Sequence, residues 1–471
     1  MIEQEQVAPA GATRRPLVAL SWAEELRATL ALAWPLVIAQ LAQNALTTTD
    51  VIMTGWLGPQ FLAGGTLAST FLMPFLVLGF GIVGAVSPLV AQARGARDIK
   101  AVRRVVRQGL WAAIAIAAVL VPILWQVKPI FAALGQNPDT TALAESYVHI
   151  AVWMFFPALG IAALRSLLSA FDSTRIILVI TVGGVVFNAA VNYVLIFGHF
   201  GFPRLELAGS AVATVLTNAL MFAAMLTYVL RHRRFKRFHI LIRFWKPDWA
   251  RFREIFRIGT PIGLTVLAEV SLFTAAALLM GLLGTDEVAA HAVALQTASM
   301  AFMVPLGLGI AATVRVGVAY GRGDPEGIRK AGWTGLALGT GFMALTCVLF
   351  LTLGPWIVSL FLDPRSPDNT NAIVLAATYL VVAGVFQIAD GAQVVAAHAL
   401  RGLSDTKIPM LVAIIGYWVV GLPVGYLLGF VVGWRGLGIW IGLAAGLAAV
   451  AVVLVTRFAM RERLGLLRAR S

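Results

Sequence analysis

Three acidic residues lie where an ionised side chain is energetically costly. Asp50, Glu269 and Asp390 fall inside long apolar segments, whereas the other acidic residues fall in connecting segments or near segment ends. An ionised carboxylate at the middle of a bilayer costs about 2.5–3.5 kcal/mol on insertion scales, so such residues generally serve a function. Two functions are open: the carboxyl groups carry protons, or they hold a mobile cation. Neutral, hydrogen-bonded acids that only tie helices together are the structural alternative.

Amide and hydroxyl side chains accompany these acids. Asn188 and Asn192 are spaced i, i+4 and therefore share one helix face, and Thr214 lies in the next apolar segment. Their oxygen atoms are suitable ligands for a small cation, but the same groups also join transmembrane helices by hydrogen bonds. A coupling role and a structural role are both open. Residues that would line a substrate cavity are Gln40, Asn44, Phe273, Phe302, Phe386, Gln387 and Tyr417.

Basic residues are expected to stay away from the three acids. No Lys or Arg lies at comparable depth in the apolar segments; Arg165, Arg175 and Arg315 lie near segment ends, where long side chains can reach water. The sequence thus predicts a membrane core that holds negative charges alone. Such a core suits a cation as the species that is bound.

Enzyme signatures are missing from the chain. The sequence has no GxxxxGKS/T nucleotide-binding loop, no HExxH metal motif and no GxSxG nucleophile motif. Its single cysteine, Cys347, excludes a disulfide framework and a CxxC metal site. We therefore predict that the chain is not an enzyme, has no cofactor, and uses an ion gradient for any uphill transport.

Twelve apolar segments must position these residues. Charged residues make up 12% of the 471 residues, about half of the roughly 25% of a soluble domain, and the mean hydropathy is +0.87. Each segment has about 20 residues or more, enough to cross a bilayer as a helix, and continuously apolar segments exclude a β-barrel. We predict an all-α polytopic membrane protein with helices near 28–54, 60–91, 107–127, 141–165, 176–198, 207–230, 257–283, 289–318, 333–362, 372–399, 409–433 and 435–460.

The distribution of basic residues predicts the orientation. With the N-terminus in the cytoplasm, the outer connections carry Lys128, Arg204, Arg365 and Arg435, and all other Lys and Arg lie on the inner side. Both termini are then cytoplasmic. The net charge of +14 reflects this topology rather than nucleic-acid binding, so we expect membrane lipids and no nucleic acid as partners.

The chain also repeats itself. Pro35 and Pro261 open the first and seventh segments, and Arg94-Gly95 matches Arg322-Gly323 at nearly the same offset. An even number of helices per half gives parallel repeats, related by an axis along the membrane normal. The predicted parts are an N-terminal tail (1–27), an N-lobe (28–230), a basic linker (231–256), a C-lobe (257–460) and a C-terminal tail (461–471).

Four stretches resemble the multidrug and toxic compound extrusion (MATE) family, in its bacterial NorM-like branch. Two are the paired openings PLVIAQLAQNALTTTDVIMTGWLG and PIGLTVLAEVSLFTAAALLMGLLG, which contain Asp50 and Glu269. The others are AHAVALQTASMAFMVPLGLGIAATVRVG and ADGAQVVAAHALRGLSDTKIPM, the latter with Asp390. The resemblance covers roughly residues 28 to 460.

This resemblance implies a fold and an activity. The fold would be two six-helix bundles that form a V, and the activity would be export of cationic and amphiphilic drugs in exchange for Na+ or H+. Glu269 and Asp390 would form the C-lobe cation site, where the coupling ion, Na+ or H+, would bind. Asp50 would be the N-lobe acid, with Asn188, Asn192 and Thr214 as its polar companions. Family members often carry Tyr one turn before the acid that corresponds to Asp390, where this chain has Phe386.

The resemblance also bears on location and on alternatives. It implies a monomer in the bacterial cytoplasmic (inner) membrane. A lipid-linked oligosaccharide flippase of the same superfamily is one alternative, and it would need cationic residues in the cavity to meet an anionic headgroup. A membrane-embedded transferase is the other, and it would need a motif of acids or histidines on a water-facing loop. The sequence shows neither feature.

Overall fold

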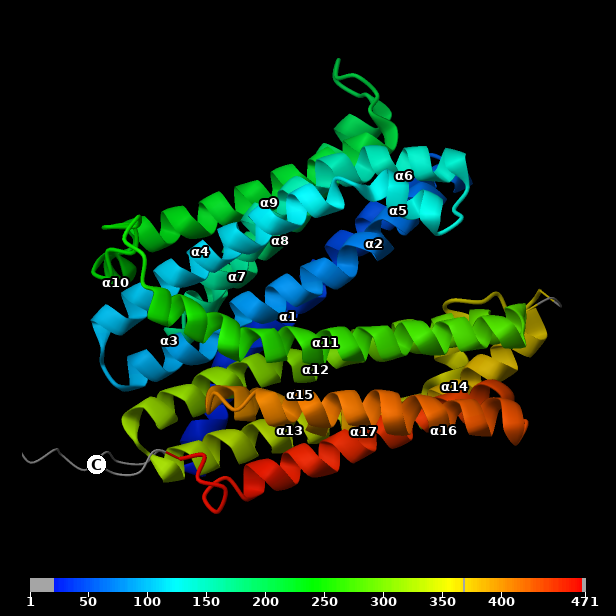
Figure 1. The fold of residues 1–471 in the computed structure, drawn as a ribbon. Coiled ribbons are helices and arrows are strands. Elements are labelled where there is room, and N and C mark those ends of the chain that lie inside the picture. The colour runs from blue at the N-terminus through cyan, green and yellow to red at the C-terminus, as the bar shows by residue number, and fades with distance from the viewer. Residues whose placement is uncertain (1–20, 367–368, 468–471) are drawn as a thin grey trace, which may run out of the picture.

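The computed structural model describes residues 21–366 and 369–467, and all regular structure in these ranges is helical. The first half forms a group of helices that we call the N-lobe (Figure 1). It contains α1 (Trp22–Gly55), α2 (Pro59–Gly84), α3 (Val86–Gly95), α4 (Ile99–Leu124), α5 (Val127–Ala133), α6 (Pro138–Ala151), the 3-10 turn η1 (Val152–Met154), α7 (Phe155–Ala170), α8 (Thr174–Phe197) and α9 (Glu206–Arg231).

The second half forms the C-lobe, which follows the short helix α10 (Arg233–Lys236). One of its spans contains two π-helical stretches, η3 and η4. The C-lobe comprises α11 (Trp249–Leu283), α12 (Thr285–Arg322), α13 (Pro325–Ser359), α14 (Thr370–Gly402), α15 (Lys407–Ile414), η3 (Ile415–Gly421), α16 (Leu422–Tyr426), η4 (Leu427–Val431) and α17 (Arg435–Ala459).

Twelve helical stretches in the described ranges are long and apolar enough to cross a membrane. Each predicted segment overlaps one of them, so the predicted all-α polytopic class and the number of spans are confirmed. Several helices begin earlier than predicted because an acceptor side chain caps them in the connecting segment. Asp98 accepts from the backbone N–H of Ala101 before α4, and Asp248 accepts from that of Arg251 before α11. The predicted tails 1–27 and 461–471 lie partly outside the described residues.

The two lobes are packed together at one end and separated at the other (Figure 1). We call the packed end, which contains α3, α10 and the end of α12, the closed end; the opposite end, with α5 and the start of α14, is the open end. Each lobe has its own hydrophobic core. The N-lobe core also includes Ile258 of α11 and Leu308 of α12, which tie the C-lobe to it.

Glycines allow the lobes to approach closely. A Cβ atom on Gly81 of α2 would lie 2.1 Å from the Cα atom of Gly263 on α11, and one on Gly95 of α3 would lie 2.1 Å from the carbonyl oxygen of Val318 on α12. Small residues at helix crossings give this backbone contact inside a membrane. Any larger side chain at these positions must separate the lobes.

Gly81→Leu should therefore weaken the packing of α2 on α11. Overpacking of this kind costs about 1–3 kcal/mol, and we expect a lower unfolding temperature or a loss of the packed arrangement, read as reduced cross-linking of paired cysteines across the closed end. Gly84→Leu is the matched control, because a Cβ atom there meets nothing within 4 Å. Equal behaviour of the two variants would contradict the role of Gly81.

Polar contacts also join the lobes at the closed end. The guanidinium of Arg315 donates to both carboxylate oxygens of Glu25, at 2.8 and 2.5 Å. The side-chain amide of Gln92 donates to the Gly402 carbonyl and to the Ser404 hydroxyl, each at 2.9 Å. Arg315 therefore does not simply extend to water, as the sequence suggested. It is held by an acid of α1 that is 3% exposed.

Candidate functional site

The N-lobe acid lies where α1 meets α8 and α9. The amide nitrogen of Asn192 donates to Asp50 Oδ1 at 2.5 Å and to Asn188 Oδ1 at 3.0 Å. The hydroxyl of Thr214 lies 3.3 Å from Asp50 Oδ2 and 3.0 Å from the Ser210 carbonyl. Because a hydroxyl has a single proton, it donates to one of these two acceptors at a time. Both asparagines are fully buried and Thr214 nearly so.

This arrangement leaves spare hydrogen-bonding capacity beside Asp50. Within the described chain, Asn192 Oδ1 and Asn188 Nδ2 are buried without a partner. The hydroxyl oxygen of Thr214 can accept a hydrogen bond from a protonated carboxyl. The cluster can therefore accommodate either the carboxylate or its protonated form, and the spare amide oxygen is a hard ligand for a small cation.

The C-lobe acids come from two different helices. Glu269 lies on α11 and interacts with the side-chain amide of Gln393. Asp390 lies on α14, is 4% exposed, and is close enough to Glu269 for their charges to interact. Tyr417, on the π-helical stretch η3, is fully buried and lies within electrostatic range of both acids. Short π-helical stretches often occur at functional sites.

Buried oxygen atoms without partners gather in the same lobe. In the ranges that the structure describes, these atoms are Asp390 Oδ1, Gln387 Oε1, Gln393 Oε1 and the Tyr417 hydroxyl. Uncharged and carboxylate oxygens are the ligand types that hard cations prefer. The donor set is therefore chemically suited to a small cation or to protons. It lacks the histidine and cysteine ligands of a transition-metal site, and no group of three or more His, Cys, Asp or Glu is found in the described chain.

Arg401 corrects the expectation that the core holds negative charge alone. Its charge interacts with Glu269, and one of its guanidinium nitrogens lies 3.1 Å from His398 Nε2. The sequence spacing indicated this, because Arg401 follows Asp390 on α14 by 11 residues, just over three helical turns. The two side chains therefore leave the helix on one face. Two acids still outnumber one arginine, so the cluster carries an excess of negative charge when both acids are ionised.

The residues expected to line a cavity divide into three groups. The C-lobe core contains Gln387, Phe386 and Tyr417. The Gln387 side-chain amide donates to the Ala298 carbonyl at 2.9 Å. Phe273 and Phe302 are half-buried and pack against that core. Gln40 accepts from Arg165 at 2.5 Å, and Asn44 is half-buried on α1.

A further buried acid, Glu287 on α12, has a complete set of partners. It accepts from Arg435 Nε at 2.8 Å and from the Tyr379 hydroxyl, and it is 2% exposed. The three residues belong to α12, α17 and α14, so the contacts tie three helices of the C-lobe together. Both carboxylate oxygens of Glu287 already accept hydrogen bonds from the protein, whereas Asp390 Oδ1 has no partner in the described chain.

Glu287→Gln should lower stability and leave transport coupled. The amide can still accept from Tyr379 but loses the charge that holds Arg435, and we expect a modest fall in the unfolding temperature, because the Arg435 side chain is 61% exposed and water screens the lost contact. Thermal unfolding in detergent measures this fall. The exposed Glu326→Gln, which breaks a surface pair with Arg329, should unfold like the wild type. A stable Glu287→Gln protein that no longer responds to an ion gradient would reverse this assignment.

Known proteins share both the sequence and the fold of this chain. The MatE family model matches residues 35–194 and 261–427. A probable multidrug resistance protein NorM from Mesorhizobium japonicum is 48% identical over 94% of this chain and 95% of its own length. Its counterpart from Brucella suis is 47% identical over 93% of each chain.

Solved structures agree in fold. The eukaryotic MATE transporter AtDTX14 superposes with a TM-score of 0.83 at 21% identity, covering 95% of this chain and all of that one. A transporter of the MOP superfamily from Pyrococcus furiosus superposes with a TM-score of 0.83 at 20% identity, covering 93% and 96% of the two chains.

The twelve membrane-spanning helices in the described part of the chain form two lobes, each with a carboxyl group held among its helices. They define a multi-pass membrane transport protein. The chain is not an enzyme, since its relatives are transporters and resistance proteins. It belongs to the MatE family, that is, to the MATE transporters.

Proposed function

We propose that this chain is a secondary active multidrug efflux transporter. It would export cationic and amphiphilic compounds by antiport with Na+ or H+, using Glu269 and Asp390 in the C-lobe and Asp50 with Asn188, Asn192 and Thr214 in the N-lobe. The observation that carries the proposal is the pair of neighbouring acids, the half-buried Glu269 on α11 and the buried Asp390 on α14, in a lobe that also holds buried oxygen atoms without partners. The relatives named as multidrug resistance proteins support the substrate class.

The mechanism follows from the two-lobed packing. With the lobes packed at the closed end, as here, a cation from the open end binds the acids and weakens their hold on a cationic drug. The drug leaves, the lobes rock, and the cation is released on the other side. Coupling requires that drug and ion favour different states or compete for one site. We propose the lobes 28–230 and 257–460 as the two moving units.

The direction of transport follows from the basic residues. Most of them lie toward the closed end, so the positive-inside rule makes this the cytoplasmic end. We propose a bacterial cytoplasmic (inner) membrane location, with both termini cytoplasmic and a monomer as the working unit. The structure then corresponds to the outward-facing state.

Efflux from proteoliposomes with imposed gradients tests the proposal. A sodium gradient and a proton gradient are applied separately, and export of a fluorescent organic cation is followed. We expect one of them to drive export against the drug gradient. Export that is equal with and without either gradient would overturn antiport.

A further inference from the structure

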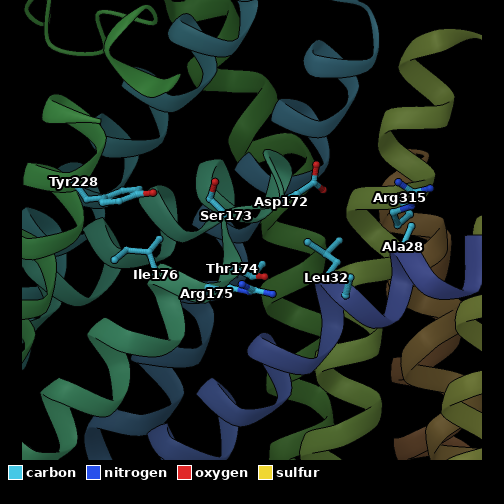
Figure 2. Close-up of a pocket in the computed structure, with 10 residues that line it drawn as sticks. Ala28, Leu32, Asp172, Ser173, Thr174, Arg175, Ile176, Tyr228 and Arg315 are labelled. Atoms are coloured by element: carbon cyan, nitrogen blue, oxygen red, sulfur yellow. The ribbon is translucent and has the colours of Figure 1, made fainter. Parts of the chain in front are cut away.

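A pocket at the closed end lies apart from both acid clusters. It has a volume of about 540 Å³ and is formed by α1, the turn between α7 and α8, the start of α8, α9 and α12 (Figure 2). Both lobes contribute, because Arg315 of α12 completes a wall that is otherwise built from the N-lobe. Neither Asp50 nor Asp390 lines this pocket.

The charges around this pocket are unbalanced. Asp172 is occupied by Arg94, whose guanidinium donates to its carboxylate at 2.6 Å, and Glu25 is occupied by Arg315. Arg175 has no such partner: it makes no hydrogen bond or ion pair with any residue that the structure describes. Figure 2 shows Arg175 beside Thr174, on the side of the pocket that faces Leu32 of α1. The pocket thus presents a guanidinium whose charge the nearby acids do not neutralise.

Uncharged groups of the pocket, like the free guanidinium, favour an anion as its ligand. Ser173 and Thr174 line the pocket at the start of α8, and the side chain of Ser173 does not cap that helix. Its first backbone N–H groups therefore lack a side-chain acceptor, and such groups favour phosphate. The rest of the wall is apolar: Leu32, Ile176 and the ring of Tyr228 lie beside these polar groups.

We infer that this pocket binds the phosphate of an anionic phospholipid, with Arg175 as the main contact. A guanidinium pairs with phosphate through two parallel hydrogen bonds, and the apolar wall suits the first part of an acyl chain. Inorganic phosphate has the same charged oxygens as the headgroup but no apolar part that would contact this wall. We therefore assign a phospholipid, rather than free phosphate, as the ligand. Because Arg315 belongs to the other lobe, occupancy would favour the packed closed end. The inference does not depend on the coupling ion or on the drug.

Lipid titration of the delipidated full-length protein tests this inference. Phosphatidylglycerol and phosphatidylcholine with the same acyl chains are compared by native mass spectrometry in detergent. We expect a preference for phosphatidylglycerol that Arg175→Gln reduces about tenfold, as loss of a charge-assisted contact predicts. Arg175→Lys should retain part of it. Ala31→Phe, which fills the pocket from an exposed position on α1 without altering its charge, should also reduce binding.

A matched control separates the pocket from general attraction to a basic protein. Arg253→Gln removes the same charge from an exposed position on α11 that does not line the pocket, and it should bind like the wild type. Equal losses in Arg175→Gln and Arg253→Gln, or no loss in either, would overturn the site. Competition by millimolar inorganic phosphate would overturn the lipid assignment in favour of a free anion; absence of competition supports the lipid.

Discussion

Asp390→Asn is expected to abolish ion-driven export while the protein still folds and inserts. The substitution keeps the size of a side chain that is 4% exposed but removes its charge and its proton-binding group. Asp390 is one of two acids that share the C-lobe cluster, so the remaining Glu269 would face Arg401 alone. The cluster with its acids ionised would then lose its excess of negative charge. Without that excess, neither a coupling cation nor a cationic drug is held.

The loss of gradient-driven export in Asp390→Asn should be large enough to measure. Coupling free energies between two ligands are typically about 1–3 kcal/mol, or 5- to 150-fold in affinity, and we expect gradient-driven export to fall to the rate seen without a gradient. Proteoliposomes with an imposed gradient and a fluorescent cation measure it. Asp363→Asn is the matched control, since Asp363 is an exposed acid in the same lobe. Export by Asp390→Asn at the wild-type rate would disprove the acid-site mechanism.

The helices could be predicted from the sequence because their physical cause is local. An apolar run of about 20 residues has few alternatives to a membrane helix, and all twelve predicted segments correspond to helical spans. The π-helical stretches η3 and η4 were not predicted; both contain glycines that pack closely on α17, a tertiary contact that no local pattern specifies. A Cβ atom added to Gly438 on α17 would lie only 2.5 Å from the backbone nitrogen of Gly429 in η4, which shows how close that packing is.

The contacts of the candidate site were predictable only within one helix. The i, i+4 spacing of Asn188 and Asn192 gave their shared face, and their hydrogen bond confirms it. The pairing of Asn192 with Asp50 spans 142 positions, and no spacing rule specifies such a contact. Arg401 was missed because its Cα position lies near a helix end, whereas its side chain reaches the charge of Glu269 on another helix.

Asp50→Asn should weaken the coupling of export to the ion gradient without disturbing the structure of the N-lobe. The new amide can turn its oxygen toward the Asn192 donor and its nitrogen toward the Thr214 hydroxyl, which can accept. The hydrogen bonds of the cluster would therefore be kept, while the charge and the proton site would be lost. We expect the unfolding temperature to stay unchanged and gradient-driven export to fall by about tenfold, which corresponds to a coupling free energy toward the lower end of the usual range.

Two comparisons make this expectation specific to Asp50. Asp139→Asn removes an exposed acid from α6 of the same lobe and should export like the wild type. Asn192→Leu removes the 2.5 Å donor while keeping the Asp50 charge, so it should retain some coupling but lower stability, because a half-buried carboxylate loses its closest partner. If Asp50→Asn instead exports at the wild-type rate while Asp390→Asn does not, the C-lobe acids alone would handle the ion, and Asp50 would serve only to hold α1 against α8.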